Sequence, residues 1–584
     1  MSNSTLPREA VIYSSAAPNA EQRARFSKFL ISKYGEDIPL VWRESGAYPN
    51  GFRLEVGSDV YDWSMDGRFK QLRQLIKSYA DAQGDSIPLL REELRNWTPK
   101  ALADEVGTVL TVGDGIATVS GLPSAVYGEI LIFEGGVRGM VQNITEREVG
   151  CILFDDDSCV SSGSSVSRTG RRAGVPAGEE FLGRVVNALG VPLDGKGEIR
   201  SSRFCPVERK APEIIDRQPV NRPLRTGITA IDSMFPIGRG QRELIIGDRQ
   251  TGKTAIALDT IMNQKGKDVV CIYVSIGQKS SSVSKLVRTL EQSGALEYTV
   301  VVHSSASDPA PMQYIAPYAG TAIGEYFMDM GRDVLIVYDD LSKHAVAYRS
   351  ISLLLGRSPG REAYPGDVFY LHSRLLERSA HLSDARGGGS MTALPIVETQ
   401  SGDVSAYIPT NIISITDGQI FLESELFFAG QRPAVNVGLS VSRVGGDAQT
   451  PAMKSAAGTL RLELAQYREM KSFTQFSSDL DEETRRQLEF GRALMQLLRQ
   501  GQGEPKEHYE QVILLTAALG RAMLPVPLEK LTDFASDMLD FFRERYNGIC
   551  EKIEKTGVMS AEDKARIVSI AADYARGYMS GEER

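Results

Sequence analysis

The spacing of apolar and polar residues changes twice along the chain. Residues 106–172 contain short runs rich in valine and isoleucine, separated by frequent glycine turns. From 173 to 449, apolar runs that suit buried strands, such as Val269 to Val274, alternate with helical patterns. From 450 to 584 the stretches are long and amphipathic, as in Glu482 to Gln500. The pattern predicts a small β-barrel, then an α/β domain with a parallel sheet, then a C-terminal α-helical bundle.

The first 105 residues have a pattern of their own. Leu54 and Val56 alternate with charged residues, and a glycine-serine turn leads into a second short strand. Helical spacing follows from Met65 to Ile76. We therefore predict a small α+β extension over residues 1–80 and a helical linker over residues 81–105. The side chains expected to face inward in the extension are Leu54, Val56, Val60 and Leu72.

A phosphate-binding motif stands between a predicted strand and a predicted helix. The motif G-x-x-x-x-G-K-T consists of Gly247, Asp248, Arg249, Gln250, Thr251, Gly252, Lys253 and Thr254. In a strand–loop–helix unit of this kind, backbone N–H groups and the helix N-terminus face a triphosphate. We expect Lys253 to reach the outer phosphates of ATP or ADP, and the Thr254 hydroxyl to hold Mg²⁺.

Two further residues are placed for nucleotide chemistry. Asp339 directly follows the apolar run that ends at Tyr338, where a carboxylate would hold the water shell of Mg²⁺. Gln278 follows the strand predicted at Val269 to Val274, where hydrolysis needs a group to orient the attacking water. An amide cannot act as a general base, so a site with Gln278 there binds nucleotide but turns it over poorly. Spacing alone leaves open that Asp339 is a solvated loop acid and Gln278 an ordinary loop residue.

Composition narrows the possible functions. The formal charge of -9 and the pI near 5.4 argue against a dedicated nucleic-acid binder, which needs a basic balance. The five cysteines include no C-x-x-C pair and the five histidines are dispersed, so we expect reduced thiols and no metal cluster. The chain has no run of about eighteen apolar residues, and its N-terminus lacks the features of a secretion signal or transit peptide. The sequence therefore predicts a cytoplasmic protein that contacts a membrane only through partners.

Several stretches of the chain resemble the alpha subunits of F-type ATP synthases. They are the phosphate loop, Gly277-Gln278-Lys279, Tyr338 to Lys343, Pro359 to Arg374 and Pro433 to Arg443. The resemblance covers residues from about 90 to 550. It implies a six-stranded type of β-barrel, a P-loop domain of the RecA-like kind and a helical C-terminal domain. It also implies a ring of three alpha and three beta subunits around a central gamma subunit, in a complex that couples proton transport to ATP synthesis.

The resemblance also implies roles for single residues. Catalytic beta subunits carry a glutamate where this chain has Gln278, so the resemblance implies the non-catalytic subunit. Arg443 matches the arginine finger that alpha subunits contribute to the neighbouring beta site. The residues that match the adenine pocket of alpha subunits are Phe427, Arg432, Pro433, Gln500 and Gln502.

A few positions depart from the family pattern. Ser280 and Ser281 stand where Arg-Ser is usual, Arg386 stands where an aromatic residue is usual, and His344 stands where glutamine is common. None of these changes removes a group that would bind phosphate or magnesium. The serine pair alters the geometry expected near the phosphates.

The N-terminal extension resembles the C-terminal end of the delta subunit, which joins the alpha subunits to the peripheral stalk. Together, the two resemblances imply beta, gamma and the stalk subunits b and delta as partners. They place the complex at the cytoplasmic face of the bacterial plasma membrane. An unrelated accessory domain is the alternative for this segment. The sequence does not distinguish proton from sodium coupling, or synthesis from hydrolysis.

Two other functions are compatible with a phosphate loop. A catalytic subunit of a rotary or secretion ATPase would need a carboxylate in place of Gln278. A ring-shaped RNA translocase like the terminator Rho would need an N-terminal face with stacking aromatic and basic residues. The net negative charge of the chain and the glycine-rich pattern of the predicted barrel argue against an RNA translocase.

Overall fold

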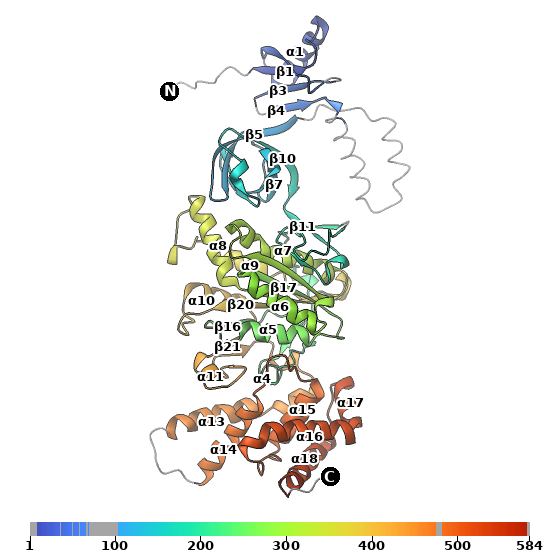
Figure 1. The fold of residues 1–584 in the computed structure, drawn as a ribbon, viewed down its shortest axis with the longest axis vertical. Coiled ribbons are helices and arrows are strands. Elements are labelled where there is room, and N and C mark those ends of the chain that lie inside the picture. The colour runs from blue at the N-terminus through green and yellow to red at the C-terminus, as the bar shows by residue number, and fades with distance from the viewer. Residues whose placement is uncertain are drawn as a thin grey trace. The chain divides into compact units, whose positions relative to one another are not determined.

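The computed structural model of the chain describes residues 9–65 apart from 36, 49, 50 and 58, residue 68, and residues 103–580 apart from 202 and 475–481 (Figure 1). The chain divides into two compact units, Met1–Ala173 and Gly174–Arg584. Most of the helix expected over Met65 to Ile76, Leu72 with it, and most of the linker expected over residues 81–105 lie outside the described residues.

The N-terminal extension is a four-stranded sheet with one helix. Its elements are β1 (Ala10–Ser14), α1 (Ala20–Tyr34), β2 (Leu40–Glu44), β3 (Arg53–Val56) and β4 (Asp59–Asp62), and the strand order is β2-β1-β3-β4. The Asn19 side chain caps α1 and Gly35 ends it in the left-handed conformation. Leu54, Val56 and Val60 are buried, as predicted. β1, α1 and β2 lie before Leu54, where the pattern used for the prediction begins, so the sequence analysis did not identify them as elements.

The β-barrel closes on itself through six antiparallel strands. They are β5 (Ala103–Gly113), β6 (Ile116–Ser120), β7 (Glu129–Phe133), β8 (Arg138–Ile144), β9 (Glu148–Leu153) and β10 (Ser165–Arg172). The order is β10-β7-β8-β9-β6-β5, and β10 pairs with β5 to complete the ring. Ala103 to Glu105 pair with β4, so these residues form a strand and not the end of a helical linker.

The nucleotide-binding domain contains one eight-stranded sheet that is parallel except at one edge. The strand order is β12 (Val185–Val186), β18 (Thr299–Ser305), β17 (Val269–Gln278), β19 (Asp333–Asp339), β20 (Ser390–Glu398), β16 (Leu244–Gly247), β21 (Gly418–Leu422) and β22 (Val441–Ser442). Only β22 runs antiparallel to its neighbour. The strands predicted from the apolar runs are confirmed as β16, β17 and β19.

Helices cover both faces of this sheet, as strands buried on both faces require (Figure 1). The helices are α5 (Lys253–Met262), α6 (Ser280–Gln292), α7 (Ala310–Asp329), α8 (Leu341–Leu354), α9 (Val368–Leu376), α10 (Tyr407–Ile415) and α11 (Ser424–Phe428). Cys271 and Tyr273 of β17 join the core that includes α5 and α6. The alternate residues Ile272 and Val274 lie under α7, whose Gly320 allows the close approach.

The C-terminal domain is helical throughout. It comprises α12 (Pro451–Ala457), α13 (Leu460–Thr474), α14 (Glu482–Leu497), α15 (His508–Leu519), α16 (Leu531–Arg545), α17 (Asn547–Thr556) and α18 (Ala561–Ser580). Its core is continuous with the α5 and α6 side of the sheet and with α4 (Thr229–Met234). All five cysteines are free. Within the described part of the chain, no helix combines the length and apolar character needed to cross a bilayer.

Candidate nucleotide site

The phosphate loop connects β16 to α5, as its motif predicts. Gly247 ends the strand, and a Cβ atom at this position would lie 2.5 Å from the backbone oxygen of Leu422 on β21. Gly252 caps α5 with φ of 95°, a left-handed conformation that favours glycine. The two glycines therefore let the loop curl against the sheet so that its N–H groups and the α5 N-terminus face one cleft.

The cleft beside this loop has a volume of about 450 Å³, within the usual range for small-molecule sites. Its lining residues are Ile228, Gln250, Thr251, Gly252, Lys253, Thr254, Ala255, Ile256, Asp259, Gln278, Asp339, Lys343, Glu398, Phe427, Arg432, Pro433, Gln500, Gly501 and Gln502. The structure thus brings together residues from the phosphate loop, three strand ends, and loops more than a hundred residues further along the chain.

Lys253 lies at the phosphate end of the cleft and is 6% exposed. Its ammonium donates to the backbone oxygens of Gly247, at 2.8 Å, and Asp248. Burial lowers the pKa of Lys253, and the carboxylates of Glu398, Asp340 and Asp339 oppose this shift. A partly desolvated cation at a helix N-terminus is well suited to bind the outer phosphates of a nucleotide.

Asp339 and Thr254, the two residues predicted to hold Mg²⁺, are hydrogen-bonded to each other. The Thr254 hydroxyl donates to Asp339 Oδ2 at 2.8 Å, and the hydroxyl of Tyr273 donates to the same oxygen at 2.5 Å. Gln278 ends β17 beside them, and its amide nitrogen donates to the backbone oxygen of Asp339 at 3.2 Å. The start of α5 and the carboxyl ends of β17 and β19 therefore place a hydroxyl, a neutral amide and a carboxylate side by side.

Asp340 holds the backbone next to this pair. Its side chain caps α8 by accepting from the Lys343 N–H at 2.8 Å, and the Lys343 ammonium lies 2.9 Å from its other oxygen. Burial raises the pKa of Asp340 to about 6, and the neighbouring Lys343 charge limits the rise.

Two predicted phosphate-loop residues, Asp248 and Arg249, are not among the residues that line the cleft. Asp248 accepts hydrogen bonds from Thr399 Oγ1 at 2.6 Å, the Gly402 N–H at 2.8 Å and Ser424 Oγ at 3.0 Å. Asp248 therefore fixes the loop to segments that follow β20 and β21. Arg249 is exposed, and its guanidinium lies 3.7 Å from the Glu398 carboxylate.

The residues that were predicted to bind the adenine base line the other end of the cleft. The Arg432 guanidinium lies over the Phe427 ring, 4.6 Å from its centroid, and Pro433 follows. Gln500 holds the facing loop, because its amide nitrogen donates to the backbone oxygens of Gly227 and Glu504, both at 2.7 Å. Gln502 lines the cleft from this loop. The five residues predicted for the adenine pocket therefore lie together.

Several lining residues lie outside the sequence-based prediction. Glu398 directly follows the apolar run of β20, which is the same signal that marked Asp339. Lys343 lies within the stretch that resembles the family, four residues after Asp339. Asp259 lies on α5, six residues after Lys253, and nothing in its local sequence distinguishes it from a surface acid.

Arg443 and the phosphate loop lie at opposite ends of β21. Arg443 is exposed and follows β22, and its N–H donates to the backbone oxygen of Asp417 at 2.8 Å. Gly247 is paired with Leu422 at one end of β21, whereas Gly418, at the other end, is paired with Ser442. Four residues of strand correspond to about 13 Å. Arg443 is therefore remote from the phosphate loop of its own chain.

The residues that depart from the family pattern lie outside the cleft lining. Ser280 and Ser281 begin α6, and Arg386 lies on an exposed turn near Asp216. His344 is fully buried on α8, and its Nε2 lies 3.0 Å from the backbone oxygen of Tyr314.

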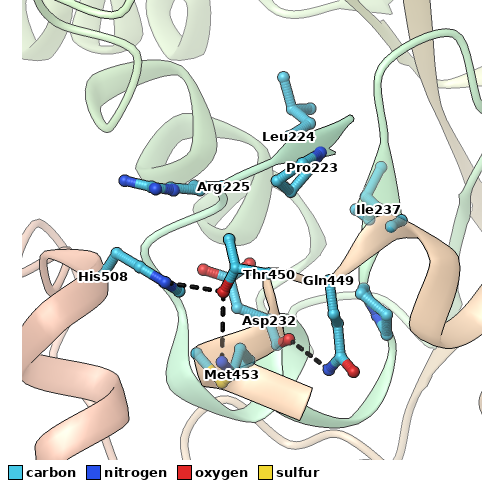
Figure 2. Close-up of a pocket in the computed structure, with 11 residues that line it drawn as sticks. Pro223, Leu224, Arg225, Asp232, Ile237, Gln449, Thr450, Met453 and His508 are labelled. Carbon is cyan, nitrogen blue, oxygen red and sulfur yellow. Dashed lines mark hydrogen bonds between the residues drawn. The ribbon is translucent and has the colours of Figure 1, made fainter. Parts of the chain in front are cut away.

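A second cavity lies where α4 meets the C-terminal helices (Figure 2). The dashed lines in Figure 2 join Thr450 to His508 and to the Met453 N–H, and Gln449 to the backbone oxygen of Asp232. Thr450 Oγ1 and His508 Nε2 are 2.8 Å apart. The volume of about 20 Å³ leaves room for roughly one water molecule. This cavity lies between α4 and the C-terminal helices and is too small for a nucleotide, whereas the larger cleft has room for one.

Comparison with known proteins agrees with this geometry. Residues 103–170 match the beta-barrel domain of the ATP synthase alpha/beta family, residues 227–442 match its nucleotide-binding domain, and residues 449–574 match its C-terminal domain. The matched ranges begin at residue 103, so the N-terminal extension lies outside them.

Individual relatives cover most of the chain. The ATP synthase subunit alpha of Acetivibrio thermocellus is 58% identical over 84% of this chain and 97% of its own length. The corresponding subunit of Clostridium botulinum is 56% identical over 84% of the chain and 98% of its own length. The ATP synthase subunit alpha of Clostridium kluyveri is 57% identical over 82% of this chain and 95% of its own length. With these identities and the three matched domains, the chain belongs to the family of ATP synthase alpha subunits.

Proposed function

We propose that this chain binds Mg-ATP or Mg-ADP in the cleft without efficient turnover. The observation that carries the proposal is Gln278, which lies beside Asp339 at the edge of the sheet where hydrolysis would need a carboxylate. A neutral amide orients groups but takes no proton from water. Such a site would retain its nucleotide, and the chain would serve the assembly as a non-catalytic subunit.

Thr254 and Asp339 would hold Mg²⁺ in this site. Their oxygens lie 2.8 Å apart, and a hydroxyl with a carboxylate is the oxygen donor set that magnesium prefers. When bound, the ion would neutralise charge on the outer phosphates. Lys253 supplies a second positive charge, and the loop N–H groups orient the phosphates against it.

Arg443 would act on a neighbouring subunit. Its position about 13 Å along β21 from the phosphate loop keeps it from the phosphates of its own chain. It is exposed, and the Arg443 N–H is tied to Asp417, whose carboxylate accepts from Arg242 at 2.8–3.0 Å. An exposed arginine on an anchored strand suits an arginine finger for the adjacent beta site.

The assembly would be the rotary head of an ATP synthase. We propose three alpha and three beta subunits around a gamma shaft, with b and delta in the peripheral stalk, at the cytoplasmic face of a bacterial plasma membrane. The N-terminal extension would serve as a delta-like attachment for the stalk. In support, it has its own core of Ile12, Leu30, Leu54 and Tyr61, with a helix on its sheet.

The nucleotide site is tested with the purified chain. It should bind Mg-ATP in equilibrium dialysis and release phosphate at a negligible rate. Lys253→Ala should weaken binding, because the outer phosphates lose their counter-charge. Lys265→Ala is the matched control, since Lys265 lies just beyond α5 and bonds to Ser293 away from the cleft. Robust turnover by the isolated chain would contradict the non-catalytic assignment.

A further inference from the structure

A buried carboxylate at the base end of the cleft has no part in phosphate or magnesium binding. Asp259 is 7% exposed and lines the cleft. It follows Lys253 by six residues on α5, which places it about 9 Å further along the helix axis. Gly501 and Gln502 line the same end, with Phe427 and Arg432. Asp259 therefore lies where a base would be and not where the phosphates would be.

One oxygen of Asp259 supports the loop that forms this end of the cleft. Oδ1 accepts a hydrogen bond from the Gly503 N–H at 3.0 Å. Among the described residues, no hydrogen bond engages the other oxygen, Oδ2. Burial raises the pKa of Asp259 to about 6, helped by the nearby Glu504 and opposed by the Gly503 hydrogen bond. Above pH 7 the group is ionised, and Oδ2 is an acceptor only.

The side chain of Gln500 does not compete for this role. Its amide oxygen accepts from the Thr229 N–H at 3.1 Å and from Thr229 Oγ1 at 3.3 Å. Its amide nitrogen donates to the backbone of Gly227 and Glu504. Both ends of Gln500 are thus committed to the protein, so it supports the loop and leaves the base edge to other groups.

We propose that Oδ2 of Asp259 accepts a hydrogen bond from the exocyclic amine of adenine, so that the cleft selects 6-aminopurine nucleotides. This inference rests on the proposed nucleotide site. An amine at position 6 donates, whereas the oxygen of a 6-oxopurine accepts. An ionised acceptor facing a carbonyl leaves both groups unpaired, and the site rejects the base for that reason.

The first test compares three Mg-triphosphates on the full-length wild-type chain at pH 8. They are ATP, purine riboside triphosphate, which lacks the amine, and inosine triphosphate, which carries an oxygen in its place. Hydrogen bonds to charged groups correspond to affinity differences of about 10- to 100-fold. We expect ATP to bind more tightly than either analogue by a factor in this range.

The second test exchanges the acceptor for a donor. Asp259→Asn keeps an oxygen for the Gly503 N–H and turns an amide NH₂ group toward the base. The variant should lose its preference for ATP over purine riboside triphosphate and bind inosine triphosphate more tightly than ATP. Glu504→Gln is the matched control, because it removes one negative charge from the same loop and should leave the wild-type order unchanged.

The outcomes separate this inference from the site on which it rests. If no triphosphate binds the wild-type chain, the nucleotide site itself is wrong. If all three bind wild-type protein with equal affinity, or if Asp259→Asn weakens all three by one factor, Asp259 only supports the loop and the inference is overturned.

Discussion

At the residue scale, the exposed arginine after β22 leads to a prediction about the whole ring. Arg443→Ala should lower the ATPase activity of the reassembled ring while nucleotide binding to this chain stays unchanged, because Arg443 is remote from its own phosphate loop. Arginine fingers contribute on the order of 10³–10⁵ in rate in small phosphoryl-transfer systems. Steady-state ATPase assays on the ring, with dialysis on the isolated chain, measure both effects.

The matched variant for this position is Arg443→Lys. Lysine keeps the charge but lacks the planar fork of the guanidinium, so it should restore only part of the activity. If a ring with Arg443→Ala hydrolysed ATP at the wild-type rate, Arg443 would not be an arginine finger.

His344 and His372 should make the folding stability of the nucleotide-binding domain depend on pH. The centroids of the two rings lie 5.4 Å apart, and both side chains are fully buried. The His344 ring also lies against Tyr314 and Tyr318, whose hydroxyls accept hydrogen bonds from Arg374. Burial holds the pKa of His344 well below its usual value, with His372 and Arg374 adding to the shift, and burial lowers the pKa of His372 to about 3. Both histidines are therefore neutral in the folded chain at pH 7.

The sign of the dependence follows from these directions. Below pH of about 6.5 the unfolded chain takes up protons that the folded chain does not, so stability is complete above that pH and falls toward about pH 3. Each histidine contributes a slope of up to about 1.4 kcal/mol per pH unit. His344→Gln should make the loss shallower between pH 6 and 4, as measured by urea unfolding. Equal slopes for both proteins would contradict this.

At the element scale, the packing of α7 on β17 depends on a glycine. A Cβ atom at Gly320 would lie 2.4 Å from a methyl group of the buried Val274, too close for an ordinary van der Waals contact. Gly320→Ala should therefore destabilise the nucleotide-binding domain by about 1–3 kcal/mol in chemical denaturation, the usual cost of overpacking.

A second helical glycine serves as the control. Gly548 lies in α17, and a Cβ atom there meets nothing within 4 Å. Gly548→Ala should be neutral or stabilising by up to about 1 kcal/mol, because alanine loses less backbone entropy on folding. A similar loss of stability in both variants would show that steric contact with Val274 is not the cause.

At the scale of the whole molecule, the extension and the ring should be separable in function. The barrel closes through β10 and β5 without the first four strands, and residues 227–574 contain the nucleotide site and the C-terminal helices. Deleting residues 1–80 should spare ATP hydrolysis by the ring and impair its coupling to the membrane sector. Hydrolysis and ATP-driven ion pumping in membrane vesicles measure the two activities.

The physical reason is effective concentration. Fusion of a stalk-binding module to this chain raises the local concentration of that contact without any new interface. Leu54→Asp is a milder variant, because it places a charge in the core of the extension alone. An extension that touches no stalk protein in the assembled complex would overturn the attachment role.

The sequence by itself determined the elements and the chemistry that local order encodes. The phosphate loop, Asp339 and Gln278 could be assigned because each follows an apolar strand, and the carboxyl ends of parallel strands meet at one edge. The residues of the adenine pocket came from the family resemblance. Leu54 and Val56 were placed inward because strand side chains alternate with a period of two.

Only the tertiary structure decided which distant segments meet. Asp259 joined the site because α5 packs against the loop after α14, where the Gly503 N–H donates to it. Glu398 joined it because β20 pairs with β16 beside the phosphate loop. The separation of Arg443 from its own phosphate loop depends on the register of β21 with β16 and β22. Periodicity reports which face of an element is buried, whereas strand order and register depend on packing between residues far apart in the chain.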